Sequence, residues 1–194
     1  MGSLKELVKK NRSYRRFHED EKIERETLIE LLELARLTPS AHNKQPLKYF
    51  LSHTKEHNEL IFPHLAWAGY LKDWPGPPEG ERPSAYIVIL NDKEIADDCF
   101  CDHGITAQTI LLGAMEKNLG GCMIGAFKKK ALKKALELPH RFEIVLVLAL
   151  GKPKELVQID KVKADGDIKY WRDKEGVHHV PKRAIEEIIL NYKE

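Results

Sequence analysis

The chain contains one long stretch with almost no charge, CFCDHGITAQTILLGAMEKNLGGCMIGAF, at residues 99–127. Only Asp102, Glu116 and Lys117 are charged within it, whereas charged residues crowd both flanks. Residues 104–119 have the length of a helix and are apolar nearly all round, so the core or another subunit must cover this helix on every side. We predict that it lies at the centre of the fold, with Asp102 as its N-cap and residues 118–121 as its stop.

Two further runs are typical of strands that are buried on both faces. They are AYIVIL at residues 85–90 and EIVLVLAL at residues 143–150. We expect a shorter strand at residues 48–53, and helices at 4–11, 25–37, 56–71, 128–138 and 184–189, from the spacing of their apolar residues. Because helices and strands are mixed without strict alternation, the fold class is predicted to be α+β.

Two segments lack such patterns. Residues 74–83 hold four prolines and two glycines, so residues 72–83 are expected to form a Pro-rich loop or lid. Residues 158–180 are expected to be a polar connection to a C-terminal helix. We find no internal repeat and no interior linker, and predict a single domain over residues 1–194.

Composition narrows the class of protein. The 194 residues carry 32 Lys+Arg against 30 Asp+Glu, with 42% hydrophobic and 32% charged residues. Such a chain is too apolar to be disordered and too charged to be membrane-embedded, and a net charge of +2 is low for a nucleic-acid binder. We expect a cytoplasmic protein that binds neither membranes nor nucleic acid. An odd number of cysteines without an export signal favours reduced thiols.

Two polar clusters are candidates for binding. In NRSYRR, residues 11–16, clustered guanidinium groups beside a serine can hold a phosphate; the alternative is a solvated basic turn. In PSAHNKQP, residues 39–46, amide side chains in a rigid loop can read the edge of a planar heterocycle; the alternative is a helix stop that leads into a strand. A basic pair, Lys182 and Arg183, could join a phosphate site.

Two more clusters are less specific. A ring could lie against the small residues of GGCMIGAF, residues 120–127, but this segment could equally be tight packing, and it lacks the Gly-x-Gly-x-x-Gly spacing of a dinucleotide site. The sequence DDCFCDH, residues 97–103, is rich in metal-capable side chains without the second cysteine pair of a zinc site. We therefore prefer two buried thiols, Cys99 and Cys101, and predict no metal site.

In their order and spacing, these segments resemble the nitroreductase-like family of FMN-dependent oxidoreductases. The resemblance covers nearly the whole chain and rests on five motifs: Arg-Ser-x-Arg at 12–15, Pro-Ser-Ala-x-Asn-x-Gln-Pro at 39–46, Asp-x-Gly-x-x-x-Gln at 102–108, the segment 120–127, and Gly-Lys-Pro at 151–153. It implies a central, mainly antiparallel sheet flanked by helices. It also implies a homodimer with a long apolar helix at its core, in which both subunits build each active site.

The resemblance further implies an FMN site. The phosphate and ribityl chain would be held by Arg12, Ser13 and Arg15, with Lys182 or Arg183 as a late basic ligand. The flavin ring would be contacted by Asn43 and Gln45 from one side and by Ser40 and Ala41 across the dimer. Backbone near its reactive edge would come from Ile124, Gly125 and Ala126. Two positions depart from the family: Asn11 replaces a frequent basic residue, and Lys152 replaces a frequent aromatic one.

The implied activity is hydride transfer from NAD(P)H to the flavin N5, followed by electron transfer to a small organic acceptor such as a nitroaromatic or a quinone. FMN carries this chemistry, so no side chain is assigned as a catalytic acid or base. Trp67, Tyr70 and Trp74 are candidates for a wall over the flavin, or else packing anchors. The alternatives are a flavin-binding or sensing protein without turnover, and a zinc-stabilised interaction domain around residues 99–103.

Overall fold

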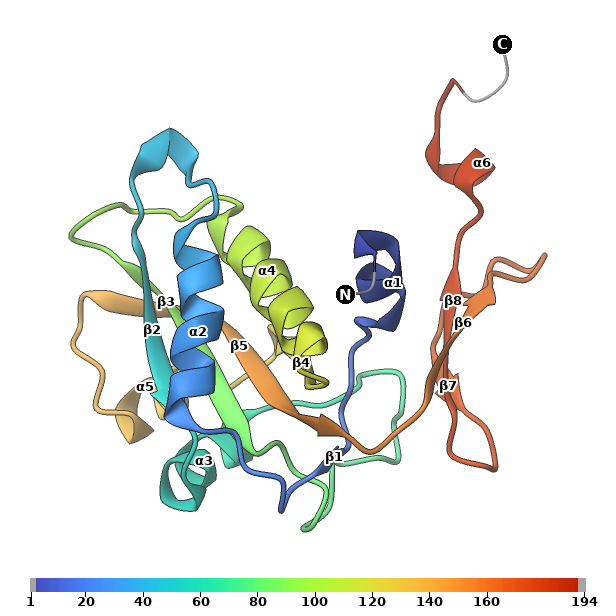
Figure 1. Cartoon of the computed structure of the whole chain (residues 1–194), viewed down its shortest axis with the longest axis horizontal. Coiled ribbons are helices and arrows are strands. Elements are labelled where there is room, and N and C mark those ends of the chain that lie inside the picture. The colour runs from blue at the N-terminus through green and yellow to red at the C-terminus, as the bar shows by residue number, and fades with distance from the viewer. Residues whose placement is uncertain (1–2, 192–194) are drawn as a thin grey trace.

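The computed structural model describes residues 3–191, and its central element there is a five-stranded antiparallel sheet (Figure 1). Its strands are β1 (Phe17–His18), β2 (Leu47–Ser52), β3 (Ala85–Asp92), β4 (Gly120–Ile124) and β5 (Phe142–Pro153). The order is β1-β5-β3-β2, and β4 pairs with β5. Residues 147–150 pair with both β3 and β4, so they lie in the middle of the sheet. Every residue of β3 is buried, which confirms the prediction for residues 85–90.

Helices cover both faces of this sheet. Ile87 and Ile89 pack with α2 (Arg25–Arg36) and α4 (Asp102–Glu116), while Tyr86 and Val88 pack on the other side with α3 (Lys55–Ile61) and α5 (Lys129–Ala135). This alternation follows from the two-residue period of a strand. The predicted α+β class, with an antiparallel sheet flanked by helices, is therefore confirmed.

The long apolar helix, α4, packs on α2 in the core cluster. Gly113 of α4 faces α2 at this contact, and a Cβ there would require the Leu34 side chain to move. The prediction that Asp102 caps α4 is wrong: Cys101 occupies the N-cap position, and the Asp102 side chain bonds to another loop. Ile105 is 37% exposed, so a single chain does not cover α4 on every side.

The C-terminal part differs most from expectation. Residues 158–180, predicted to be a polar connection, contain strands: β6 (Val157–Lys161), β7 (Trp171–Arg172) and β8 (His178–Lys182) form a second sheet in the order β6-β8-β7. Figure 1 shows this sheet, which we call the arm, standing beside α1 (Leu4–Lys10) and away from the main sheet. The final helix, α6, is only the turn Ile185–Ile188.

The predicted helix at 56–71 is also shorter. It comprises α3 and the 3₁₀ turn η2 (Phe62–His64), because Pro63 lacks the N–H that a continuing helix needs. Residues 72–83 form neither helix nor strand, as predicted. Across residues 3–191, no helix is both long enough and apolar enough to cross a membrane.

Candidate functional site

A cavity of about 340 Å³ opens where the N-terminal segment meets β4, α4 and the arm. We call it the arginine cavity. The described residues that line it include three cations and no carboxylate: Asn11, Arg12, Ser13, Arg15, Gln108, Leu111, Met123, Tyr170, His178, Val180 and Lys182. The folded chain therefore brings the predicted phosphate residues Arg12, Ser13 and Arg15 together with Lys182, although 170 positions separate Arg12 from Lys182 in the sequence.

The arginine segment is fixed against β4 by backbone contacts. Ser13 forms a β-bridge with Gly121, and the Tyr14 N–H donates to the Gly121 carbonyl at 3.1 Å. The bridge and this hydrogen bond set the position of Ser13 and Arg15 along the edge of the cavity. Glycine at residue 121 is required on the β5 side, where a Cβ would collide with the Ala149 carbonyl oxygen.

A buried carboxylate, Glu155, joins the same segment to the arm. Its side chain is 0% exposed and accepts hydrogen bonds from the Arg15 N–H at 2.5 Å and the Arg16 N–H at 3.2 Å. It also accepts one from Arg172 Nη2 of β7 at 2.7 Å. Glu155 therefore orients the backbone that carries Arg15. Glu155 could not be identified from the sequence, because a single glutamate after a strand has no local pattern.

The Arg15 side chain contacts two aromatic residues of the arm, which also contact each other. Its Nη1 is 3.2 Å from His178 Nε2, and its guanidinium lies 5.0 Å from the centre of the Tyr170 ring. Burial lowers the pKa of His178 to about 4, and the charges of Arg15 and Arg172 act in the same direction. His178 is thus neutral at pH 7 and can accept a hydrogen bond from Arg15 without neutralising its charge.

Two buried nitrogen atoms of this cavity have no hydrogen-bond partner among the described residues: Arg12 Nε and His178 Nδ1. Since Nε2 of neutral His178 accepts from Arg15, we assign the ring proton to Nδ1, which leaves that donor unused. Unpaired buried donors are costly, and guanidinium groups match phosphate oxygens well. The donor set therefore fits a phosphate monoester such as that of FMN.

The two residues of the late basic pair have different surroundings. Lys182 lines the arginine cavity. Arg183 does not, and its Nη1 donates to Glu187 Oε2 at 3.1 Å. Of the two alternatives, the structure places only Lys182 beside Arg12 and Arg15.

Residues 39–46, which we call the amide loop, are held by Asp102. Its carboxylate is 4% exposed and accepts from Ser40 Oγ at 2.6 Å and from the Ala41 N–H at 3.0 Å. The Gln45 N–H donates to Ser40 Oγ at 2.9 Å. Asn43 and Gln45 have φ values of 53° and 52°. This is the left-handed backbone conformation, which residues other than glycine adopt at a cost. Asp102 thus maintains a strained loop.

The amide loop does not reach the arginine cavity within one chain. Ser40 and Gln45 line a separate cavity of about 220 Å³, next to Asp102 at the start of α4. Gln108 and Leu111, further along α4, line the arginine cavity instead. In Figure 1 the loop lies beyond the upper end of α2, and α1 lies on the other side of α4.

Residues 124–126, which the resemblance places beside the flavin ring, lie next to the arginine cavity. Ile124 ends β4, directly after the lining residue Met123. Gly125 and Ala126 are exposed, and no atom lies within 4 Å of a Cβ built on Gly125. This segment offers accessible backbone with open space beside it.

The arm holds the Pro-rich loop in place. Arg172 lies over the Trp74 ring at 4.4 Å, and the Tyr70 N–H donates to the Tyr170 hydroxyl at 3.3 Å. Trp67 is buried in the core cluster, so it is a packing anchor, whereas Tyr70 is 49% exposed. The Pro-rich loop is therefore tied to the arm by contacts between segments about a hundred residues apart.

The cysteine-rich segment is not a pair of buried thiols. Cys99 is buried, but Cys101 is exposed, which corrects the prediction. Within residues 3–191, no group of three or more His, Cys, Asp or Glu side chains is arranged to hold a metal ion.

Comparison of the chain with known proteins matches it to one family. The model of the nitroreductase family matches residues 8–152. YodC of Bacillus subtilis, named as a candidate NAD(P)H nitroreductase, is 23% identical over 185 residues, which covers 78% of this chain and 90% of YodC. A crystal structure of a nitroreductase family protein from Clostridium difficile 630 matches with a TM-score of 0.69 at 19% identity and covers both chains fully. A further structure, a candidate nitroreductase from Exiguobacterium sibiricum in complex with FMN, has a TM-score of 0.66 at 21% identity and covers 80% of this chain and 90% of its own.

Proposed function

Because the chain belongs to the nitroreductase family, we propose that it is an FMN-dependent oxidoreductase that transfers electrons from NAD(P)H to a small organic acceptor such as a nitroaromatic or a quinone. The observation that carries this proposal is the arginine cavity. It collects three cations and two unused buried donors, and no carboxylate among the described residues lines it. With a quinone, the overall reaction converts NAD(P)H, a proton and the quinone into NAD(P)⁺ and the hydroquinone.

We assign the binding of the cofactor to this chain's own groups. Arg12, Ser13, Arg15 and Lys182 would hold the FMN phosphate by charge-assisted hydrogen bonds. The exposed backbone of Gly125 and Ala126 would lie along the ring. When bound, FMN supplies at its N5 a two-electron carrier between NAD(P)H and the acceptor. The protein contributes position and a fixed positive field, and we assign no side chain as a proton donor.

We propose that a second copy of the chain completes the site. Apolar side chains are exposed on α1, at the C-terminal end of α2 and on α4: Leu4 is 68%, Leu37 71% and Ile105 37% exposed. Burying such a surface would stabilise a homodimer. The amide loop is one hydrogen-bonded unit, so all four of its candidate residues, Ser40, Ala41, Asn43 and Gln45, would approach the flavin from the same subunit.

The proposal is tested by titrating the purified chain with FMN and then measuring NAD(P)H oxidation with and without a benzoquinone. We expect stoichiometric FMN binding and acceptor-dependent NAD(P)H consumption. A chain that binds FMN but consumes no NAD(P)H with any acceptor would support the alternative of a flavin-holding or sensing protein. A chain that does not bind FMN would overturn both. Sedimentation analysis tests the dimer separately.

A further inference from the structure

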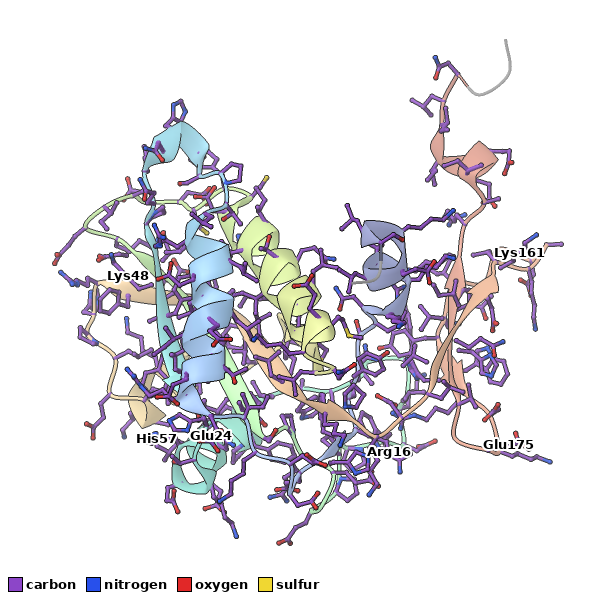
Figure 2. All side chains as sticks on the ribbon, in the orientation of Figure 1. Arg16, Glu24, Lys48, His57, Lys161 and Glu175 are labelled. Atoms are coloured by element: carbon purple, nitrogen blue, oxygen red, sulfur yellow. The ribbon has the colours of Figure 1, made fainter. Side chains whose placement is uncertain are left out.

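The structure contains a third and larger cavity, of about 480 Å³, that shares no lining residue with the arginine cavity. It lies between the connection from β1 to α2, helix α3 and the segment that leads into β3. We call it the Arg82 cavity. Glu24, one of its lining residues, is at the lower end of α2 next to α3 in Figure 2. The volume lies within the roughly 300–1,000 Å³ typical of small-molecule sites.

Two polar groups of this cavity have no partner among the described residues. Ser84 is 7% exposed and its Oγ makes no hydrogen bond. The Nε of Arg82 is buried and equally unpaired, and no ion pair to Arg82 is formed within residues 3–191. Because buried donors are normally satisfied, these two groups indicate a ligand that supplies acceptor oxygens.

Neighbouring polar groups fix the backbone around these two side chains. Glu19 Oε2 accepts from the N–H groups of Gly80 at 2.5 Å and Arg82 at 3.1 Å. Asn58 Nδ2 donates to the Ser84 carbonyl at 2.9 Å, and Asn58 Oδ1 accepts from Ser52 at 2.7 Å. The backbone of Arg82 and Ser84 is thereby fixed, while their side-chain donors remain available.

The cavity also has an aromatic wall and an acidic rim. The Arg82 guanidinium lies 4.5 Å from the centre of the Phe62 ring, and both residues line the cavity. Glu24 and Glu56 are exposed lining residues that form no ion pair within the described chain. Lys55, the rim lysine on α3, is 3.9 Å from Glu59. The cavity thus combines the buried Nε of Arg82, the buried Ser84 hydroxyl, a Phe62 ring that Arg82 covers on one face, and exposed carboxylates at its mouth that form no ion pair among the described residues.

We propose that the Arg82 cavity binds a zwitterionic amino acid with an aromatic side chain. The carboxylate accepts hydrogen bonds from Arg82 Nε and Ser84 Oγ, the ring packs against Phe62, and the ammonium group faces Glu24 and Glu56. An anion alone would gain no contact with the carboxylates at the mouth, and an amine alone would leave the two buried donors unpaired. This site is independent of the proposed oxidoreductase activity.

The test is calorimetric titration of the full chain with L-phenylalanine, 3-phenylpropionate and phenethylamine. The two analogues lack the ammonium and the carboxylate group, respectively. We expect L-phenylalanine to bind saturably and each analogue to bind at least about tenfold more weakly, as one charge-assisted contact is lost. Saturating FMN should leave L-phenylalanine binding unchanged, because the two cavities share no lining residue.

Variants of the lining residues test whether L-phenylalanine binds in the Arg82 cavity. Arg82→Gln and, separately, Ser84→Ala should weaken L-phenylalanine binding, Arg82→Gln by about tenfold or more. Arg141→Gln is the matched control, since Arg141 also lies over a phenylalanine ring but outside this cavity, and it should retain wild-type affinity. Circular dichroism checks that each variant is folded. The proposal is overturned if the wild type shows no saturable binding up to about 10 mM, if both cavity variants bind as the wild type does, or if FMN competes.

Discussion

Replacing Glu155 by glutamine should destabilise the protein strongly. In the native chain its fully buried carboxylate accepts from two backbone N–H groups and from Arg172, whose side chain is 16% exposed. A glutamine oxygen can accept from at most two of these three donors, and its NH₂ group is itself a donor. Arg172 would also lose its ion-pair partner, and breaking a buried pair on one side costs about 3–5 kcal/mol.

The assay is thermal and urea unfolding of the two proteins at neutral pH. At about 2–4 °C per kcal/mol for a chain of this size, the loss corresponds to a Tm decrease of roughly 6–20 °C. Glu187→Gln is the matched control: its pair with Arg183 is about half-exposed, so the change should cost less than about 1 kcal/mol. Equal, small effects of the two substitutions would refute the role given to Glu155.

Three further predictions concern other contacts. The pKa of Glu81 is about 2, because its carboxylate accepts hydrogen bonds from Arg16, against 4.5 for an unperturbed glutamate. Its contribution, about 1–2 kcal/mol once solvent screening of the pair is allowed for, is present above pH 4.5 and is lost as the pH falls toward 2; pH-dependent urea unfolding should show that Glu81→Gln lacks this component. Lys182→Ala should weaken FMN binding, measured by fluorescence, by about 1.5–3 kcal/mol, while Arg183→Ala should not; equal losses would contradict the placement of Lys182. Asp102→Asn should speed hydrogen exchange in the amide loop by about tenfold or more without changing β3; unaltered exchange would show that Asp102 does not hold the loop.

The core of the fold could be predicted from sequence because its signals are local. The apolar runs at residues 85–90 and 143–150 can only be buried strands or helices, and their length decides for strands. The helix α4 also has a local signal, its long apolar run, and its two ends were predicted to within three residues. Alternating burial then places α2 and α4 on one face of the sheet.

The arm could not be predicted, because its stability comes from long-range contacts. β6 and β8 are polar strands, and β7 has two residues. Their pairing is stabilised by partners elsewhere, such as Glu155, which contacts Arg15 across 140 positions. No residue pattern near His178 or Tyr170 indicated that they would line the arginine cavity.

The candidate site was predicted in part. The order of motifs indicated Arg12, Ser13 and Arg15, and the structure places Lys182 with them. Asp102 was identified as a helix cap from its position alone, whereas its hydrogen bonds to Ser40 and Ala41, some 60 positions away, depend on tertiary packing. Their roles toward FMN remain predictions.

The central claim is that this chain binds FMN and uses it to take electrons from a reduced nicotinamide. It is tested most directly by recording the visible spectrum of the FMN-loaded protein, without oxygen, before and after adding NADH or NADPH. Our account predicts that the flavin absorbance bleaches with at least one donor and returns when a quinone is added. Bound FMN whose spectrum neither nicotinamide changes would contradict it.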